Sequence, residues 1–164
     1  MTLHRAWVGL GSNLDDPRRH IERALEELDR LPLTRRLMAS RLHVSRPVGP
    51  QDQPDFINAV ALLETRLSPL ALLDQLQALE QAHRRVRARR WGPRTLDLDL
   101  LLFDDSVLAL PRLRVPHPEL THRTFVVLPL LELAPDLVLP DGRPLAPLAS
   151  RLPSDDPTPV LPGA

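Results

Sequence analysis

The sequence contains no cysteine and no lysine, and only five of its 164 residues are aromatic. Without cysteine, neither a disulfide framework nor a thiolate zinc site can form. Without lysine, a phosphate-binding P-loop is excluded, because the lysine of that motif reaches the phosphates. All 21 basic residues are therefore arginines, so the clustering of arginines, and not their number, carries information about function.

Charge and hydropathy argue against two further classes of protein. Twenty-one basic and twenty-one acidic residues give a formal net charge of zero, which argues against a general nucleic-acid or membrane-surface binder. No apolar run approaches the roughly 20 residues that span a bilayer. The residues Met1–Arg5 show no long apolar stretch typical of a signal peptide. We therefore expect a cytoplasmic protein that acts on small molecules, with neither nucleic acid nor membrane as a partner. We also expect a monomer, although charge and hydropathy do not decide the oligomeric state.

The chain length suits one compact domain, since domains usually have about 100–200 residues. We expect that domain to comprise residues 1–152. Residues 153–164 contain four prolines and no hydrophobic periodicity, which predicts a disordered, proline-rich tail. The sequence contains no internal repeat and no sign of a second hydrophobic core.

Apolar runs and helix-capping signals predict alternating strands and helices. We predict strands at residues 7–11, 38–44, 56–65 and 96–103, a helix that begins at Pro17 and is ended by Pro32, and a second helix from Pro69 to Val86. This order is that of a ferredoxin-like α+β fold, βαββαβ, with an antiparallel sheet and helices packed on one face. A C-terminal extension follows, with a helix over Arg123–Leu133 that Pro129 kinks or interrupts.

Asp97 and Asp99 lie two residues apart in the last predicted strand. Side chains at i and i+2 of a strand face the same side, about 6.6 Å apart along the chain, so the two carboxylates project together while the alternating leucines point into the core. Neighbouring carboxylates repel each other unless cations neutralise them, and Mg²⁺ prefers oxygen ligands that it shares with substrate phosphates. The pair is a candidate site for two magnesium ions in phosphoryl transfer. The alternative is a solvated polar face of an amphipathic strand.

The residues before this pair are rich in arginine. Between residues 84 and 94 there is no acid, and the arginines are Arg84, Arg85, Arg87, Arg89, Arg90 and Arg94. Guanidinium groups beside metal-binding carboxylates suit a polyphosphate, because they donate forked hydrogen bonds to its oxygens. The alternative is a solvated helix end whose arginines oppose the helix dipole, which accounts for one or two of the six.

A further pattern is typical of a site for a flat heterocycle. Phe56 and Asn58 lie two residues apart at the edge of a predicted strand, so a ring and an amide share one side of the sheet. Stacking contributes about 1–3 kcal/mol per base, and an amide pairs with a donor–acceptor edge. The alternative is a phenylalanine of the core. His117, near Arg112 and Arg123 in sequence, is either a phosphate contact or a structural histidine.

Four runs of sequence together resemble a known family. They are GLGSNL (Gly9–Leu14), GPQDQPDFINAV (Gly49–Val60), RWGPRTLDLDLLLF (Arg90–Phe103) and RVPHPEL (Arg114–Leu120). In this order they are similar to the 6-hydroxymethyl-7,8-dihydropterin pyrophosphokinases of folate biosynthesis, over roughly residues 5–145. The R-x-G-P-R-x-x-D-x-D segment is highly specific, unlike D-x-D alone. The resemblance implies transfer of a diphosphate from ATP, the co-substrate, to the hydroxymethyl group of the pterin, leaving AMP.

The resemblance also implies roles for individual residues. Asp97 and Asp99 match the aspartates that hold two Mg²⁺ ions, and they form the catalytic group together with Arg85 and Arg94. The positions matching the pterin site are Ser45, Val48, Phe56, Asn58 and Phe125, with the two phenyl rings stacking on the pterin and the amide reading its edge. The positions matching further ATP contacts are Gln77, Glu80, Arg87, Arg112, His117 and Arg123.

Two rival interpretations stay open from the residues alone. A nucleotidyl-transferring or cyclising palm-like domain also places two aspartates on a ferredoxin-like sheet, but it releases pyrophosphate and not AMP. The same fold also occurs in nucleic-acid-binding modules, against which the zero net charge and the few aromatic residues argue.

Overall fold

The computed structural model describes residues 2–46, 53–84, 95–152 and 158–160. The strands are β1 (His4–Ser12), β2 (Thr34–Ala39), β3 (His43–Ser45), β4 (Phe56–Thr65), β5 (Asp97–Phe103), β6 (Leu108–Ala109), β7 (Arg114–Val115) and β8 (Thr158–Val160). The helices are α1 (Pro17–Leu28), α2 (Pro69–His83), the 3-10 helix η1 (Leu120–His122), α3 (Thr124–Leu133) and α4 (Ala146–Ala149). In this part of the chain, none of the helices has the length and apolar character needed to cross a bilayer.

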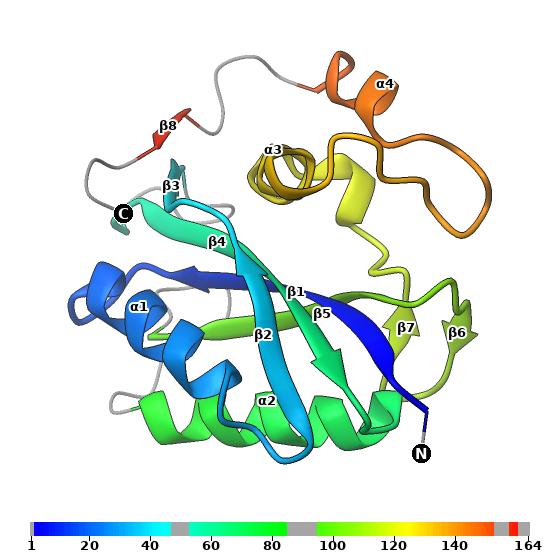
Figure 1. The fold of residues 1–164 in the computed structure, drawn as a ribbon. Coiled ribbons are helices and arrows are strands. Elements are labelled where there is room, and N and C mark those ends of the chain that lie inside the picture. Colours follow the sequence, from blue (N-terminus) through cyan, green and yellow to red (C-terminus); the bar gives the residue numbers. More distant parts are fainter. Residues whose placement is uncertain (1, 47–52, 85–94, 153–157, 161–164) are drawn as a thin grey trace.

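One antiparallel sheet forms the middle of the molecule (Figure 1). Its strand order is β5–β1–β4–β3–β8, and β2 pairs with the end of β4 that β3 leaves free. β1 and β4 pair over nearly their whole lengths, from His4↔Thr65 to Ser12↔Ile57. An antiparallel sheet with helices packed on it is an α+β fold, so the predicted fold class is confirmed at this level.

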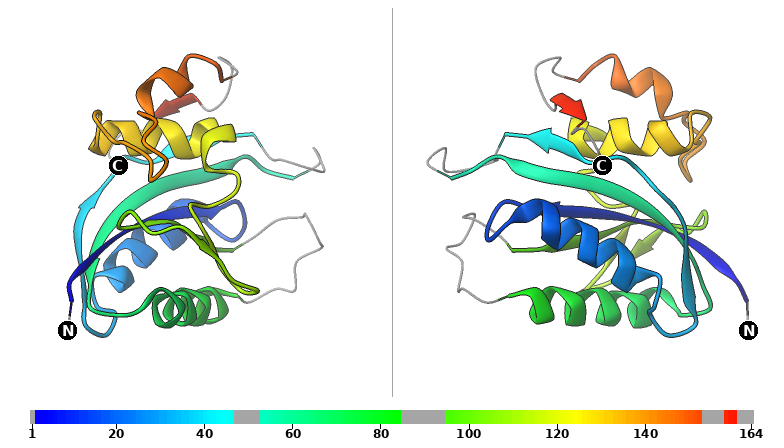
Figure 2. Two further views of the ribbon diagram at one scale, coloured as in Figure 1. Left: turned by 90° about the vertical axis from the view of Figure 1, so that its right-hand side faces the viewer. Right: turned by 60° about the vertical axis from the view of Figure 1, so that its left-hand side comes forward.

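The helices cover both faces of the sheet, not one face as predicted. Figure 2 shows α1 and α2 on one side of the sheet and α3 and α4 on the other. The reason is that the second face of the sheet is also apolar. It presents Trp7, Val60, Leu62 and Leu101, and the C-terminal extension buries them with α3. Burying apolar area on both faces is what makes β1 buried at nearly every position.

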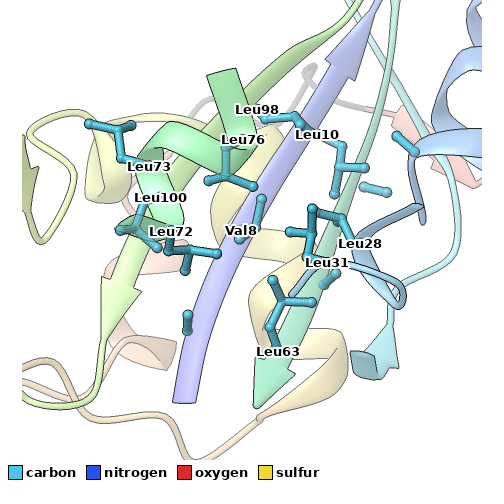
Figure 3. Packing of buried hydrophobic residues seen from close by; sticks show 14 of the residues in the cluster. Val8, Leu10, Leu28, Leu31, Leu63, Leu72, Leu73, Leu76, Leu98 and Leu100 are labelled. Carbon is cyan, nitrogen blue, oxygen red and sulfur yellow. The ribbon is translucent and has the colours of Figure 1, made fainter. Parts of the chain in front are cut away.

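The larger core lies between the sheet and the α1–α2 layer, as Figure 3 shows. Leu72, Leu73 and Leu76 of α2 pack there against Val8 of β1. A fully buried leucine contributes roughly 1.5–3 kcal/mol relative to an exposed one. The periodicity that predicted the two helices is therefore the periodicity of their buried faces.

A β-bulge explains why the second half of β5 is apolar at every position. Trp7 pairs with Leu102 while Val8 pairs with Leu100, so Leu101 is an extra residue in β5. As a result Leu101 and Leu102 both contribute to the core beneath α3, whereas Leu100 contributes to the core beneath α2. Because both faces are covered at this point, alternation with polar residues is lost.

Three predicted elements differ from the structure. The strand predicted at 38–44 is two strands, β2 and β3. At the bend between them, Ser40 Oγ accepts a hydrogen bond of 2.9 Å from the Val60 amide and takes the place of a ladder partner. Helix α1 ends at Leu28, before Pro32 is reached, and α3 continues through Pro129 without interruption.

Part of the expected tail belongs to the sheet. Thr158–Val160 forms β8 and pairs with β3, so the expectation of disorder is wrong for these three residues. Without β8, β3 would be an edge strand at this end of the sheet, and the free amide and carbonyl groups of such an edge pair readily with an extended segment. The rest of 153–164 lies outside the described residues, and the domain boundary at 152 stays a prediction.

Candidate active site

The start of β5 presents Asp97 and Asp99 to the face of the sheet opposite α2. Leu96, Leu98 and Leu100 are buried in the core beneath α2, and the period of the strand turns the two aspartates the other way. Their partners on β1 are Gly11 and Gly9. These two glycines and the two aspartates line the same space on this face of the sheet.

That space is a cavity of about 300 Å³ under the N-terminal turn of α3. Its lining is Gly9, Leu10, Gly11, Ser45, Arg46, Phe56, Asn58, Ala59, Asp97, Asp99, His117, Arg123, Phe125 and Val126. The cavity therefore brings together three classes of predicted residue. They are the acidic pair, two aromatic rings from different elements, and the cationic or imidazole groups of Arg123 and His117.

Asn58 forms the floor of the cavity beside Gly11. It is 3% exposed, and its Nδ2 donates a hydrogen bond of 2.6 Å to Ser45 Oγ. A Cβ at position 11 would lie 3.3 Å from Asn58 Oδ1 and 3.7 Å from Phe56 Cδ1. Gly11 is thus the residue that permits the amide and the ring to lie close to the β1 backbone. The Ser45 bond fixes the direction of the amide.

His117 is held by the backbone at the opposite edge of the cavity. Its amide donates to the Leu101 carbonyl at 2.9 Å, and its Nδ1 accepts from the Glu119 amide at 3.1 Å. Because Nδ1 accepts a hydrogen bond, a neutral imidazole at this position carries its proton on Nε2. Nε2 lies 4.0 Å from Asp99 Oδ1, so this N–H faces the acidic pair and is available to an anionic oxygen.

Arg123 and Phe125 reach the cavity from the start of α3. The Arg123 guanidinium carbon lies 5.6 Å from the centre of the Phe125 ring, within the range of a cation–π contact. A cation and an aromatic ring therefore support each other on one wall, while Phe56 lines another part of the same cavity.

Glu80 of α2 lies outside the cavity lining but contacts the backbone between the two aspartates. Its Oε2 accepts a hydrogen bond of 2.8 Å from the Leu98 amide. The pKa of Glu80 is raised from 4.5 to about 7, mainly by burial and to a lesser extent by the charges of Asp97 and Asp99. The Leu98 hydrogen bond and Arg84 lower it in part. The acidic pair and Glu80 are therefore electrostatically linked.

The other predicted ATP contacts lie elsewhere or outside the described residues. Arg112, between β6 and β7, donates from Nη2 to Asp74 Oδ1 at 2.5 Å and to Gln77 Oε1 at 3.1 Å on α2. Neither Gln77 nor Arg112 is among the described residues that line the cavity. The remaining predicted site residues, Val48, Arg85, Arg87 and Arg94, lie outside the residues that the structure describes.

The cavity also contains residues that the sequence patterns did not single out. Gly9 and Gly11 carry a signal that was available, since glycines inside a strand mark close approach of another group. Arg46 follows Ser45 at the end of β3 and brings an additional cation to the lining. In an arginine-rich sequence no local signal distinguishes it.

A family model and individual relatives match the sequence of this chain. A family model described as 7,8-dihydro-6-hydroxymethylpterin-pyrophosphokinase (HPPK) matches residues 7–135. A relative from Pseudomonas aeruginosa, named 2-amino-4-hydroxy-6-hydroxymethyldihydropteridine pyrophosphokinase, is 54% identical over 162 residues, which are 99% of this chain and 99% of the relative. A relative of the same name from Haemophilus influenzae is 47% identical over 89% of this chain and 91% of the relative.

The fold is also similar to that of a solved structure. The crystal structure of Plasmodium falciparum HPPK-DHPS with pteroate matches with a TM-score of 0.72 at 14% sequence identity, over 92% of this chain. This chain spans only 42% of that longer protein. At this identity the likeness concerns the fold.

Proposed function

The chain belongs to the 7,8-dihydro-6-hydroxymethylpterin-pyrophosphokinase family, and from that premise we propose which of its residues carry out pyrophosphoryl transfer from ATP to hydroxymethyldihydropterin, a reaction of folate biosynthesis. One observation carries the assignment: the acidic pair lines the same cavity as Phe56, Asn58 and Phe125. A stacked ring and a phosphate chain held in one cavity place an alcohol beside a phosphorus atom.

The pterin occupies the part of the cavity between β4, β3 and α3. Phe56 and Phe125 supply the aromatic faces, and Asn58 presents an amide whose direction is set by Ser45. An aromatic face and a fixed amide suit a flat heterocycle with hydrogen-bonding edges. Val48 stays a proposed backbone contact that rests on the resemblance.

The acidic pair fits two Mg²⁺ ions. Both carboxylates face the cavity, and the Asp99 side chain is 44% exposed, so its oxygens are accessible to a hydrated cation. Within the described residues, no three His, Cys, Asp or Glu side chains are arranged to hold a metal ion. Two carboxylates leave most coordination positions of the ions to phosphate oxygens and water, as magnesium sites on nucleotides require. When bound, Mg²⁺ supplies positive charge to the phosphate oxygens and favours loss of the hydroxyl proton.

The nucleotide occupies the side of the cavity with His117 and Arg123. The Nε2–H of His117 faces the acidic pair and donates to a phosphate oxygen, and Arg123 donates from the start of α3. Arg112, Gln77 and Glu80 stay proposed ATP contacts that rest on the resemblance. The same holds for Arg85, Arg87 and Arg94 on the phosphates.

In the reaction, the pterin hydroxyl oxygen forms a bond to the β-phosphorus of ATP. The bond from that phosphorus to the oxygen bridging to the α-phosphate breaks, AMP leaves with the bond's electron pair, and the hydroxyl proton passes to solvent. Catalysis is then positioning and electrostatic stabilisation. The chain's own contribution is to hold ring and phosphates in line, to neutralise charge with arginine and to donate a hydrogen bond from His117.

Further proposals concern the fold and its setting. The order β5–β1–β4–β3 with two crossover helices on one face supports a ferredoxin-like core. A monomer stays a proposal. The zero net charge supports small-molecule substrates without a nucleic-acid partner. Use of ATP supports a cytoplasmic location.

Incubation with ATP, Mg²⁺ and hydroxymethyldihydropterin, followed by separation of the nucleotides, tests the function. We expect AMP and the pterin diphosphate as products. Asp97→Asn and Asp99→Asn are each expected to lose at least ~100-fold in rate with the fold intact, comparable to loss of an electrostatic stabiliser. Asp105→Asn, on the exposed turn after β5, is the matched control. Release of pyrophosphate would instead indicate nucleotidyl transfer, and near-normal turnover of either variant would contradict the metal assignment.

A further inference from the structure

Glu132 is the only charged residue in α3, whose other side chains are nearly all apolar (TFVVLPLLEL). Apolar packing is not directional, so it holds such a helix against the sheet but sets its position along the sheet only weakly. Glu132 provides the directional bonds. Its Oε2 accepts from the Arg41 amide at 2.8 Å, and its Oε1 lies 3.1 Å from His43 Nε2.

His43 lies in the same cross-strand row as the centre of the cavity floor. The row runs Asp97–Gly11–Asn58–His43 across β5, β1, β4 and β3. His43 is 7% exposed, and its hydrogen bond to Glu132 connects β3 directly to α3. Ser45, which orients the Asn58 amide, follows two residues later on β3. The wall that orients the amide and the helix that carries Phe125 are thus joined by one carboxylate.

Phe125 and Glu132 lie seven residues apart on α3. Residues at i and i+7 share one face of a helix, about 10.5 Å apart along its axis. Between them, Pro129 has no amide hydrogen to donate to the Phe125 carbonyl, which lies four residues before it. The first turn of α3 is therefore supported less by its own hydrogen bonds and depends more on the anchoring of the rest of the helix.

From these contacts we infer that Glu132 is a positioning residue of the pterin site: with His43 and the Arg41 amide it fixes α3 relative to β3, and so sets the distance of Phe125 from Asn58. The inference rests on the proposed pterin site. Glu132 does not line the cavity, and it acts through Phe125 and β3.

Three variants and one control test this role. Glu132→Leu keeps a side chain of similar size but removes both bonds and the ion pair between Glu132 Oε1 and Arg41 Nε at 3.7 Å. Glu132→Gln keeps an oxygen that accepts from the Arg41 amide. His43→Leu removes the other partner. Glu64→Leu is the matched control. It removes an ion pair of similar geometry, between Glu64 Oε1 and Arg35 Nε at 2.9 Å. Glu64 lies on a part of β4 that does not line the cavity.

We expect Glu132→Leu to raise the KM for the pterin about tenfold, equivalent to about 1.4 kcal/mol, with the KM for ATP changed less than about twofold. Glu132→Gln is expected to restore most of the pterin affinity. Glu132→Leu combined with His43→Leu is expected to cost little more than Glu132→Leu alone, because both changes break the same connection. Equal effects on both substrates, an equally raised pterin KM in Glu64→Leu, or additive effects of the two changes would overturn the inference.

Hydrogen exchange separates this inference from the proposed function. Amides in the first two turns of α3 are expected to exchange about tenfold faster in Glu132→Leu than in the wild type or Glu64→Leu. This measurement needs no substrate. Unchanged exchange in Glu132→Leu would refute the anchoring even if the enzyme forms AMP. Faster exchange in Glu132→Leu, together with a wild type that forms no AMP, would leave the anchor standing and reject the pterin site.

Discussion

The linkage between Glu80 and the acidic pair makes the stability of the metal-free protein depend on pH. In Glu80→Gln the side chain no longer titrates, but its Oε1 still accepts from the Leu98 amide, as Glu80 Oε2 does at 2.8 Å. The substitution therefore removes the charge and keeps the contact. Any difference between wild type and variant then reports the cost of burying a carboxylate next to Asp97 and Asp99.

The sign follows from the direction of the shift. The pKa of Glu80 is raised from 4.5 to about 7 in the folded protein, so between these values the folded state binds more protons than the unfolded state. The free energy of unfolding therefore falls as pH rises from 4.5 to 7. The upper limit of this loss is about 3 kcal/mol, since one pH unit corresponds to roughly 1.4 kcal/mol. Because Glu80 is only partly buried, water screens its charge, and we expect about 1–2 kcal/mol.

Urea unfolding of the metal-free protein at a series of pH values from 4.5 to 8 measures this term. Glu80→Gln is expected to equal the wild type near pH 4.5 and to be about 1–2 kcal/mol more stable at pH 8. Glu26→Gln, an exposed glutamate of α1, is the control and should follow the wild type throughout. If the stability of Glu80→Gln changed with pH as much as that of the wild type, the carboxyl group would not be the source and the reasoning would fail.

Two further outcomes test the floor of the cavity and the α1–α2 layer. Gly11→Ala places a Cβ 3.3 Å from Asn58 Oδ1, so we expect the KM for the pterin to rise about tenfold in steady-state assays with the KM for ATP unchanged; equal pterin KM values would show that the amide does not read the ring. His83→Ala removes buried hydrogen bonds to His20 Nδ1 (2.7 Å) and Glu27 Oε1 (2.5 Å), and should lower the free energy of unfolding by about 2–3 kcal/mol. An unchanged urea midpoint would contradict that role for His83.

Local patterns predicted those features that depend on neighbours in the chain. The strand 56–65 has the bounds of β4, and the helix predicted from Pro69 is α2, because a side chain–capped start at Ser68 and a periodic apolar face are local properties. The common direction of Asp97 and Asp99 likewise follows from the period of a strand. The bend at Ser40 was missed, because it depends on the Val60 amide of a different strand.

The amino-acid order alone thus determined the succession of strands and helices. It also determined that the two aspartates share one side of their strand, and that Phe56 and Asn58 share one side of theirs. Only the tertiary structure decided that α3 covers the second face of the sheet, that Glu80 bonds the backbone between the two aspartates, and that Glu132 joins His43 from 89 residues away. The physical reason is that backbone geometry repeats over a few residues, whereas these contacts exist only after apolar burial has brought distant elements together.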